Sequence, residues 1–122
     1  MTDPLPLASG RLLAFAGALC GAAGVALSAM AAHRGGAFTG TAANFLLFHA
    51  PALLAIGLAG TGRWLRLGGF VLLFGLVVFC GDLLSRDLVA NRLFPFAAPI
   101  GGTALIAGWL AIAIAALVRP KA

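Results

Sequence analysis

LLAFAGALCGAAGVALSAMAA, residues 12–32, is a run of 21 residues without a formal charge. A helix needs about 20 mainly apolar residues to cross the ~30 Å hydrocarbon core of a bilayer, so this run is long enough for one span. Residues 35–62, 67–81 and 93–118 are also uncharged, and the run at 67–81 reaches this length if its helix continues through Asp82 to Ser85. The sequence therefore predicts four transmembrane helices, at about 11–32, 43–61, 67–85 and 99–118.

The composition indicates the class of protein. The chain is 62% hydrophobic and only 9% charged, so it has too few polar residues to cover the surface of a water-soluble domain. Four spans with short connectors use almost all of its 122 residues. We expect an all-α integral membrane protein whose four transmembrane helices form one compact antiparallel bundle over residues 11–118. An irregular N-terminal tail at 1–10 precedes this domain, and a short C-terminal tail at 119–122 follows it.

The positive charges lie between the spans. The net charge is +5, but the basic residues form no patch, so nucleic acid is not an expected partner. Lys and Arg beside a span tend to remain on the cytoplasmic side. With four spans, both termini share a side with the middle connector, and that side carries five basic residues against three: Arg11, Arg63, Arg66, Arg119 and Lys121 against Arg34, Arg86 and Arg92. We expect a bacterial inner-membrane protein with both termini in the cytoplasm.

Small residues recur along single faces of three spans. Such faces let helix backbones approach closely, which favours association where lipid offers no hydrophobic driving force. We expect these faces to pack helix against helix, and the lipid bilayer, other integral membrane proteins or further copies of the chain to be its partners. The packing residues are Gly17, Gly21, Gly24 and Ser28 on the first helix, Gly68 and Gly75 on the third, and Gly101 and Gly108 on the fourth.

The ionisable side chains near the outer ends of the spans form the candidate polar site. His49 is the most costly of them to bury, because it lies inside the apolar run Phe45-Leu-Leu-Phe-His49. Asp82 and Arg86 are spaced for an ion pair on one helix face, and His33 ends the first span. A His49–Asp82 pair is suited to relay protons, bind an ion or hold a polar headgroup. Alternatively, His49 bonds a carbonyl or a neighbouring side chain and fixes helix register, and Asp82 only pairs with Arg86.

Other polar and aromatic residues carry weaker signals. We expect Asp87 and Arg92 to be solvated loop charges, and Trp109 to face lipid or fill packing space. Cys20 and Cys80 lie at different depths and are expected to be two buried free thiols. Two histidines without a cluster of carboxylates or thiols are a weak metal signal. No nucleotide or catalytic motif is present, so we expect neither a cofactor nor an enzyme.

Four motifs, in order, resemble those of the small bacterial inner-membrane family of unknown function typified by YgdD. They are Ala26-Leu-Ser-Ala-Met-Ala-Ala-His33, Phe45-Leu-Leu-Phe-His49, Val78-Phe-Cys-Gly-Asp82, and Ala98-Pro-Ile-Gly-Gly102 followed by Ala107-Gly-Trp109. The resemblance covers about residues 11–118. It implies a four-helix inner-membrane protein in which His33 and His49 are positions the family uses, and it supplies no activity.

The chain departs from the family pattern at three polar positions. Leu46 stands where the family has glutamine, Asp82 where it has serine, and Ala98 where it has threonine. Its small size, its glycine faces and the loss of these polar residues favour an accessory, assembly or scaffold subunit that packs against larger membrane proteins. The alternative is a small oligomeric carrier or channel-like protein whose pathway includes His49 and Asp82.

Overall fold

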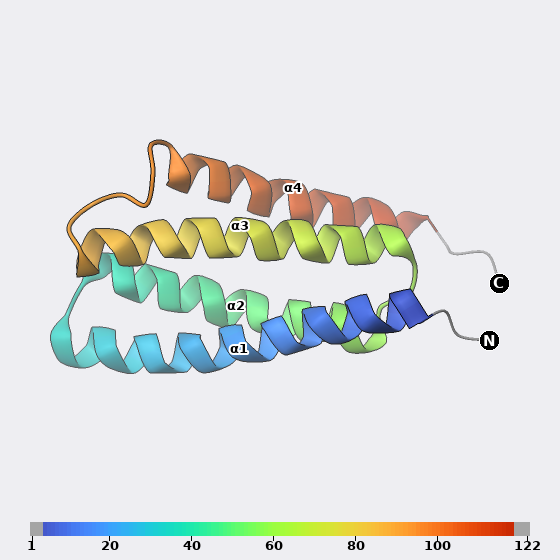
Figure 1. Cartoon of the computed structure of the whole chain (residues 1–122), viewed down its shortest axis with the longest axis horizontal. Coiled ribbons are helices and arrows are strands. Elements are labelled where there is room, and N and C mark those ends of the chain that lie inside the picture. The colour runs from blue at the N-terminus through green and yellow to red at the C-terminus, as the bar shows by residue number, and fades with distance from the viewer. Residues whose placement is uncertain (1–3, 119–122) are drawn as a thin grey trace.

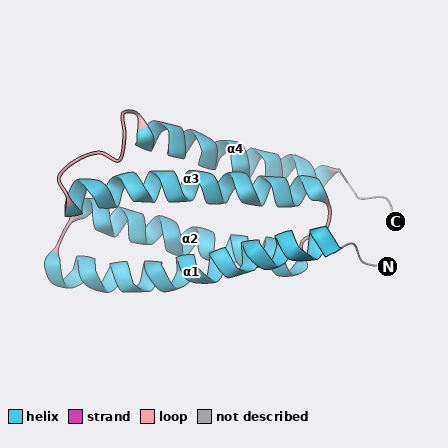
Figure 2. Ribbon diagram, in the orientation of Figure 1, coloured by secondary structure: helices cyan, strands magenta, loops and turns pink. Residues whose placement is uncertain are grey.

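The computed structural model describes the backbone of residues 4–118 and the side chains of residues 8–118. Within this range the chain forms four helices: α1 (Pro4–Arg34), α2 (Ala37–Ala59), α3 (Arg63–Leu88) and α4 (Ala97–Leu117) (Figure 1). Figure 2 shows that only turns and loops connect them. Each helix is long and apolar enough to cross a membrane. The expected all-α class with four long apolar helices is therefore confirmed.

Successive helices run in opposite directions. The start of α1, the turn between α2 and α3 and the end of α4 share one end of the molecule, called the inner end below (Figure 1). The turn between α1 and α2 and the connector between α3 and α4 lie at the opposite, outer end. α1 packs most extensively against α2, and the α4 backbone lies close to that of α3 alone, while α2 and α3 join the two pairs. The bundle is thus two helical hairpins joined along α2 and α3.

The helices are longer than the expected spans. α1 begins at Pro4, so helix replaces the irregular structure expected over most of residues 1–10. Proline is well tolerated in a first helical turn, because the amides there have no partner inside the helix. Residues 1–3, and the tail expected at 119–122, lie outside the described part of the chain.

α2 also begins earlier than expected, at Ala37, because the turn that precedes it is very short. Gly35 and Gly36 alone separate α1 from α2, with φ angles of 77° and 102°. Glycine adopts this left-handed region without the steric cost that other residues carry. Consequently Pro51 lies well inside α2. At ~1.5 Å per residue, His49 lies about 18 Å from the start of its helix, rather than the ~9 Å that the expected start at residue 43 would give.

The core consists of leucines, and the surface is also apolar. The largest side chains that are completely buried include Leu13, Leu53, Leu72 and Leu76, one or more from each of the first three helices. In contrast, bulky apolar side chains such as Phe15 and Phe48 point outward. An apolar exterior around a small core suits a protein surrounded by lipid. Helices suit the same environment, because their backbone polar groups form hydrogen bonds with one another.

The glycines of the expected packing faces lie at contacts between helices. A Cβ atom on Gly17 would lie 2.9 Å from the amide nitrogen of Leu54 in α2. On the other hairpin, a Cβ on Gly75 would lie 2.7 Å from the amide nitrogen of Leu105, and one on Gly101 would lie 2.5 Å from that of Phe79. Gly24, Gly68 and Gly108 have similarly close neighbours, whereas Gly21 has ordinary space and Ser28 is half-buried. These glycine faces therefore hold each hairpin together.

Gly10 and Gly57 form an additional close contact that the sequence analysis did not include. A Cβ on Gly10 would lie 2.7 Å from the carbonyl oxygen of Gly57, and one on Gly57 would lie 2.5 Å from the carbonyl oxygen of Gly10. These two glycines bring the inner ends of α1 and α2 together. The heptad spacing between Gly10 and Gly17 indicates that both lie on one helix face, but Gly10 fell in the segment expected to be irregular.

Candidate functional site

His49 lies near the middle of α2, where its side chain has two partners. It is only 7% exposed. Its Nδ1 lies 2.7 Å from the carbonyl oxygen of Phe45, one turn earlier in the same helix. Its Nε2 lies 3.1 Å from Nε1 of Trp109, which comes from α4. Both ring nitrogens are therefore satisfied inside the protein.

These two partners determine the protonation state of His49. A carbonyl oxygen only accepts hydrogen bonds, so Nδ1 must carry a proton and donate it to Phe45. An indole N–H only donates, so Nε2 must be unprotonated to accept the bond from Trp109. The imidazole is therefore neutral, in the Nδ1–H tautomer. A proton added at Nε2 would face the indole N–H and break this bond.

Trp109 has a role that the sequence analysis missed. We expected it to face lipid or fill packing space, and one face of the ring is indeed open, since the residue is 43% exposed. Its N–H, however, is bonded to His49, although the backbones of α2 and α4 make no close contact with each other. The side-chain pair therefore links the two hairpins across the space between α2 and α4. The 60 residues that separate the partners in sequence gave no signal for it.

Asp82 and Arg86 form a separate site at the outer end of α3. Asp82 is completely buried, and its Oδ2 accepts from Nε of Arg86 at 3.0 Å and lies 2.9 Å from Nη2 of the same residue. Both guanidinium nitrogens thus approach one carboxylate oxygen, and hydrogen bonds between two ionised groups are stronger than those between neutral groups. The second oxygen of Asp82 accepts from the backbone N–H of Leu93 at 2.8 Å. Asp82 thus fixes the connector between α3 and α4, and its predicted partner Arg86 is present.

Asp87 fastens the start of α2. Its Oδ2 accepts from the backbone N–H and from the hydroxyl of Thr39, at 2.6 and 2.7 Å. Thr39 is the third residue of α2, and its N–H is one of the first four in the helix that have no partner within it. Asp87 therefore caps α2 from another helix, where no side-chain cap is supplied locally. Our expectation of a solvated loop charge for Asp87 was wrong, because the two-glycine turn brings the start of α2 within its reach.

The predicted polar residues do not meet in one site. His33 is exposed at the end of α1, His49 lies deep in α2, and Asp82 lies at the end of α3 bonded to other partners. The suggested His49–Asp82 pair is not formed. Within the described residues, no three His, Cys, Asp or Glu side chains are grouped to hold a metal ion. Cys20 and Cys80 are free thiols in the shared core, and Cys80 donates weakly to the Ala42 carbonyl at 3.6 Å.

The four apolar helices and their internally bonded polar groups define a multi-pass membrane protein. Residues 20–102 match the family described as "Protein of unknown function (DUF423)", and the chain belongs to this family. His49, Asp82, Arg86 and Asp87 lie within the matched residues, whereas Trp109 lies beyond them.

Several curated bacterial proteins are similar to the chain. The UPF0382 membrane protein of Haemophilus influenzae is 30% identical over 112 residues, covering 84% of this chain and 87% of the relative. The UPF0382 membrane protein of Staphylococcus epidermidis is 37% identical over 78 residues, and the match spans 64% of its length and 62% of this chain. The UPF0382 inner membrane protein YgdD of Escherichia coli is 31% identical over 80 residues, covering 63% of this chain and 61% of YgdD. No solved structure matches the chain. The YgdD-like resemblance is confirmed.

Proposed function

We propose that this protein is an accessory, assembly or scaffold subunit that packs against larger integral membrane proteins. The observation that supports this most is how its polar groups are used. Among the described residues, every buried side-chain nitrogen or oxygen has a hydrogen-bond partner. For His49, Asp82 and Asp87 these partners lie within the chain and link its helices and connectors. This leaves the surface as the part of the molecule available for function.

The outward face of α4 is the part of that surface best suited to another helix. Apart from the bond between Trp109 and His49 of α2, α4 packs only against α3 within the described residues, so most of its circumference has no protein neighbour. Pro99, Thr103 and Ala107 follow one another at intervals of four residues and are all exposed. Together with Ile100 and Ala104 they line a shallow groove of about 420 Å³. Small residues at this spacing allow the close backbone approach typical of transmembrane helix pairs.

The test compares two substitutions on α4. Ala107→Leu fills the groove, whereas Ala113→Leu adds the same volume at an exposed position about 120° around the helix. We expect gentle detergent extraction of the wild type to recover a larger membrane complex. Ala107→Leu should reduce this recovery at least about fivefold, while Ala113→Leu should leave it unchanged. A wild-type protein that is purified alone, or equal losses in both variants, would contradict the proposal.

Gly17 and Gly24 are not suitable positions for this test. Both face α2 at close range, so larger side chains there would separate α1 from α2 and change the protein's own fold. The carrier or channel alternative receives no support from the geometry, because its two central residues, His49 and Asp82, are bonded to different partners. Equal ion flux in liposomes with and without the protein would argue further against it.

We also propose that both termini lie in the cytoplasm. The inner end of the bundle carries Arg11, Arg63 and Arg66, and the outer end carries Arg34, Arg86 and Arg92. Arg119 and Lys121 follow α4 in sequence and raise the total on the inner side to five. A C-terminal reporter that is active only in the cytoplasm should therefore be active, and a reporter active only outside it should be silent. The reverse pattern would refute this orientation.

A further inference from the structure

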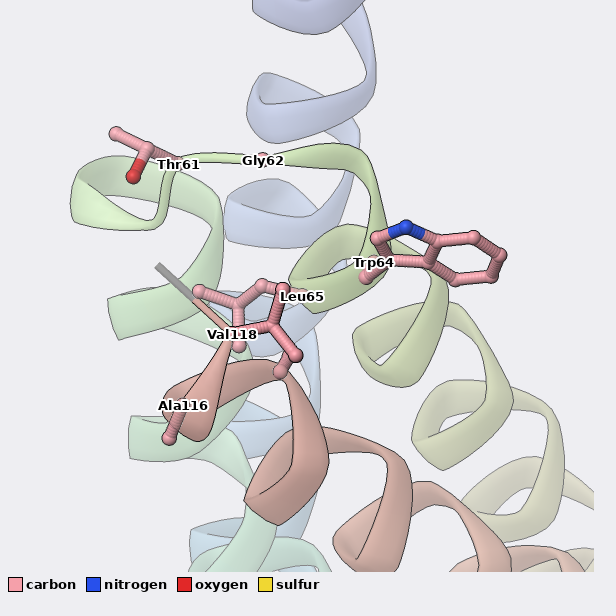
Figure 3. Close-up of a pocket in the computed structure, with 7 residues that line it drawn as sticks. Thr61, Gly62, Trp64, Leu65, Ala116 and Val118 are labelled. Carbon is pink, nitrogen blue, oxygen red and sulfur yellow. The ribbon is translucent and has the colours of Figure 1, made fainter. Parts of the chain in front are cut away.

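A group of apolar grooves surrounds Trp64 at the inner end of the bundle. One cavity of about 290 Å³ lies between the Thr61–Gly62 turn, the start of α3 and the end of α4. Figure 3 shows the Leu65 and Val118 side chains close together at this place, while the ring of Trp64 extends away from them. The ring is 59% exposed. Trp64 is thus a projecting aromatic wall rather than part of the packed core.

Two larger grooves continue from Trp64 along the helices. A groove of about 420 Å³ runs between α3 and α4, where Leu67 and Ile114 are among its lining residues. Another, of about 430 Å³, lies toward the start of α1 and is lined by Arg63, Arg66 and Phe70 as well as Trp64. Both grooves include Trp64 and Leu67, so they meet along this part of α3. Phe70 and Ala111, which line these grooves, lie deeper in the bundle than the two arginines, which occupy the first turn of α3.

Neither arginine has an acidic partner among the described side chains. The Arg63 guanidinium lies over the Trp64 ring, 5.4 Å from its centroid, and Arg66 is half-buried. Among the side chains described, the acidic residues are Asp82 and Asp87, both in the last turns of α3 at the outer end. The ion pair seen within residues 8–118, Arg86–Asp82, is also there. Two guanidinium groups therefore lie beside apolar grooves, and no carboxylate of residues 8–118 neutralises them.

From this arrangement we propose that the inner end binds an anionic phospholipid. Its phosphate lies between Arg63 and Arg66, and its acyl chains occupy the grooves on the two sides of Trp64. A guanidinium offers paired donors that match phosphate oxygens, so two adjacent arginines suit a phosphate headgroup. Along α3 the arginines come first and the apolar residues follow deeper in the bundle. This order matches that of a lipid, whose charged headgroup lies at the surface and whose acyl chains extend inward. A basic pocket between transmembrane helices is a known form of headgroup site.

Native mass spectrometry of the detergent-purified protein tests this. The probes are phosphatidylglycerol and phosphatidylcholine with identical acyl chains, because these two lipids differ only in the headgroup, which is anionic in the first and zwitterionic in the second. We expect phosphatidylglycerol to be retained at least about fivefold more than phosphatidylcholine, and Arg63→Gln combined with Arg66→Gln to abolish the difference. Arg92→Gln is the matched control, since Arg92 is exposed in the connector at the opposite end. It should retain lipid as the wild type does.

A second variant tests the grooves without changing any charge. Ala115 lines two of the cavities, and Ala115→Trp should fill them and lower the retention of phosphatidylglycerol at least about threefold. Three results would each overturn the proposal. They are equal retention of the two lipids by the wild type, equal losses for the paired arginine variant and Arg92→Gln, and a lipid-free dimer that Ala115→Trp disrupts. The last result would mean that a second copy of the chain occupies the grooves.

Discussion

Replacing Trp109 by Phe removes one N–H group and keeps an aromatic ring. The group left without a partner is Nε2 of His49, whose side chain is 7% exposed and therefore out of reach of water. An unsatisfied buried acceptor costs about 1–3 kcal/mol in soluble proteins. Side-chain hydrogen bonds between membrane helices average only about 0.6 kcal/mol, with a maximum near 1.7. Because Trp109 is 43% exposed, the smaller ring leaves no closed cavity, so only the hydrogen-bond contribution applies. We expect a loss of about 1 kcal/mol, or roughly fivefold in the unfolding equilibrium.

Reversible unfolding in detergent measures this loss, and Trp64→Phe is its matched control. Trp64 is the other tryptophan of the chain and projects from the inner end, so its replacement should change the free energy of unfolding by less than about 0.5 kcal/mol. A double-mutant cycle with His49→Leu isolates the bond itself, because the separate loss of the bond to Phe45 cancels in it. A coupling energy below about 0.3 kcal/mol would refute the argument that this pair links the hairpins.

Three further predictions concern packing and the outer end. Gly101→Ala should lower the free energy of unfolding by about 1–3 kcal/mol, because its Cβ would overlap the α3 backbone, whereas Gly21→Ala, with an ordinary contact at 3.6 Å, should be neutral or stabilising. Denaturant titration of the two variants should separate them, and equal stabilities would be inconsistent with the close contact. Asp82→Asn should lower the free energy of unfolding by about 2 kcal/mol, which is less than the full penalty for breaking a buried ion pair because the Arg86 side chain is 27% exposed. It should also accelerate hydrogen exchange at the Leu93 amide, and unchanged exchange there would contradict the role of Asp82 in fixing the connector. Asp87→Ala should lower the free energy of unfolding by about 1 kcal/mol, because it removes the cap of α2. Amide exchange should become faster in the first turn of α2 alone, and unchanged exchange there would exclude a capping role.

Most of the fold was predictable because each helix is set by local composition. A charge-free run of about 20 residues has few alternatives in a bilayer, so four helices followed directly. The lengths of α1 and α2 were harder to predict from the sequence. Gly35 and Gly36 permit a turn of only two residues, so both helices extend beyond their apolar cores. The prolines near the start of α1 also led us to expect irregular structure there, although proline is compatible with the first turn of a helix.

The polar site was only partly predictable, for a physical reason. The Asp82–Arg86 pair joins residues four apart on one helix, and helical periodicity predicts such neighbours. Trp109, which bonds His49, and Thr39, which bonds Asp87, come from other helices, and a single sequence carries no information about which faces meet. Trp109 gave no polar signal, because an indole reads as an apolar residue until its N–H is located opposite an acceptor. The sequence could therefore identify His49 as costly to bury without identifying the donor that accounts for its burial.

The arrangement of two hairpins has a consequence for how the molecule is made. The glycine contacts of the first hairpin join α1 to α2, and those of the second join α3 to α4. Each set connects segments that are neighbours in the chain, and such local contacts form rapidly. The first hairpin is thus able to close once Ala59 has been inserted, before the second hairpin enters the membrane. The contacts between the two hairpins, which include the bonds from Asp87 to Thr39 and from Trp109 to His49 and the packing of α3 on α1 and α2, then wait for the second half to arrive.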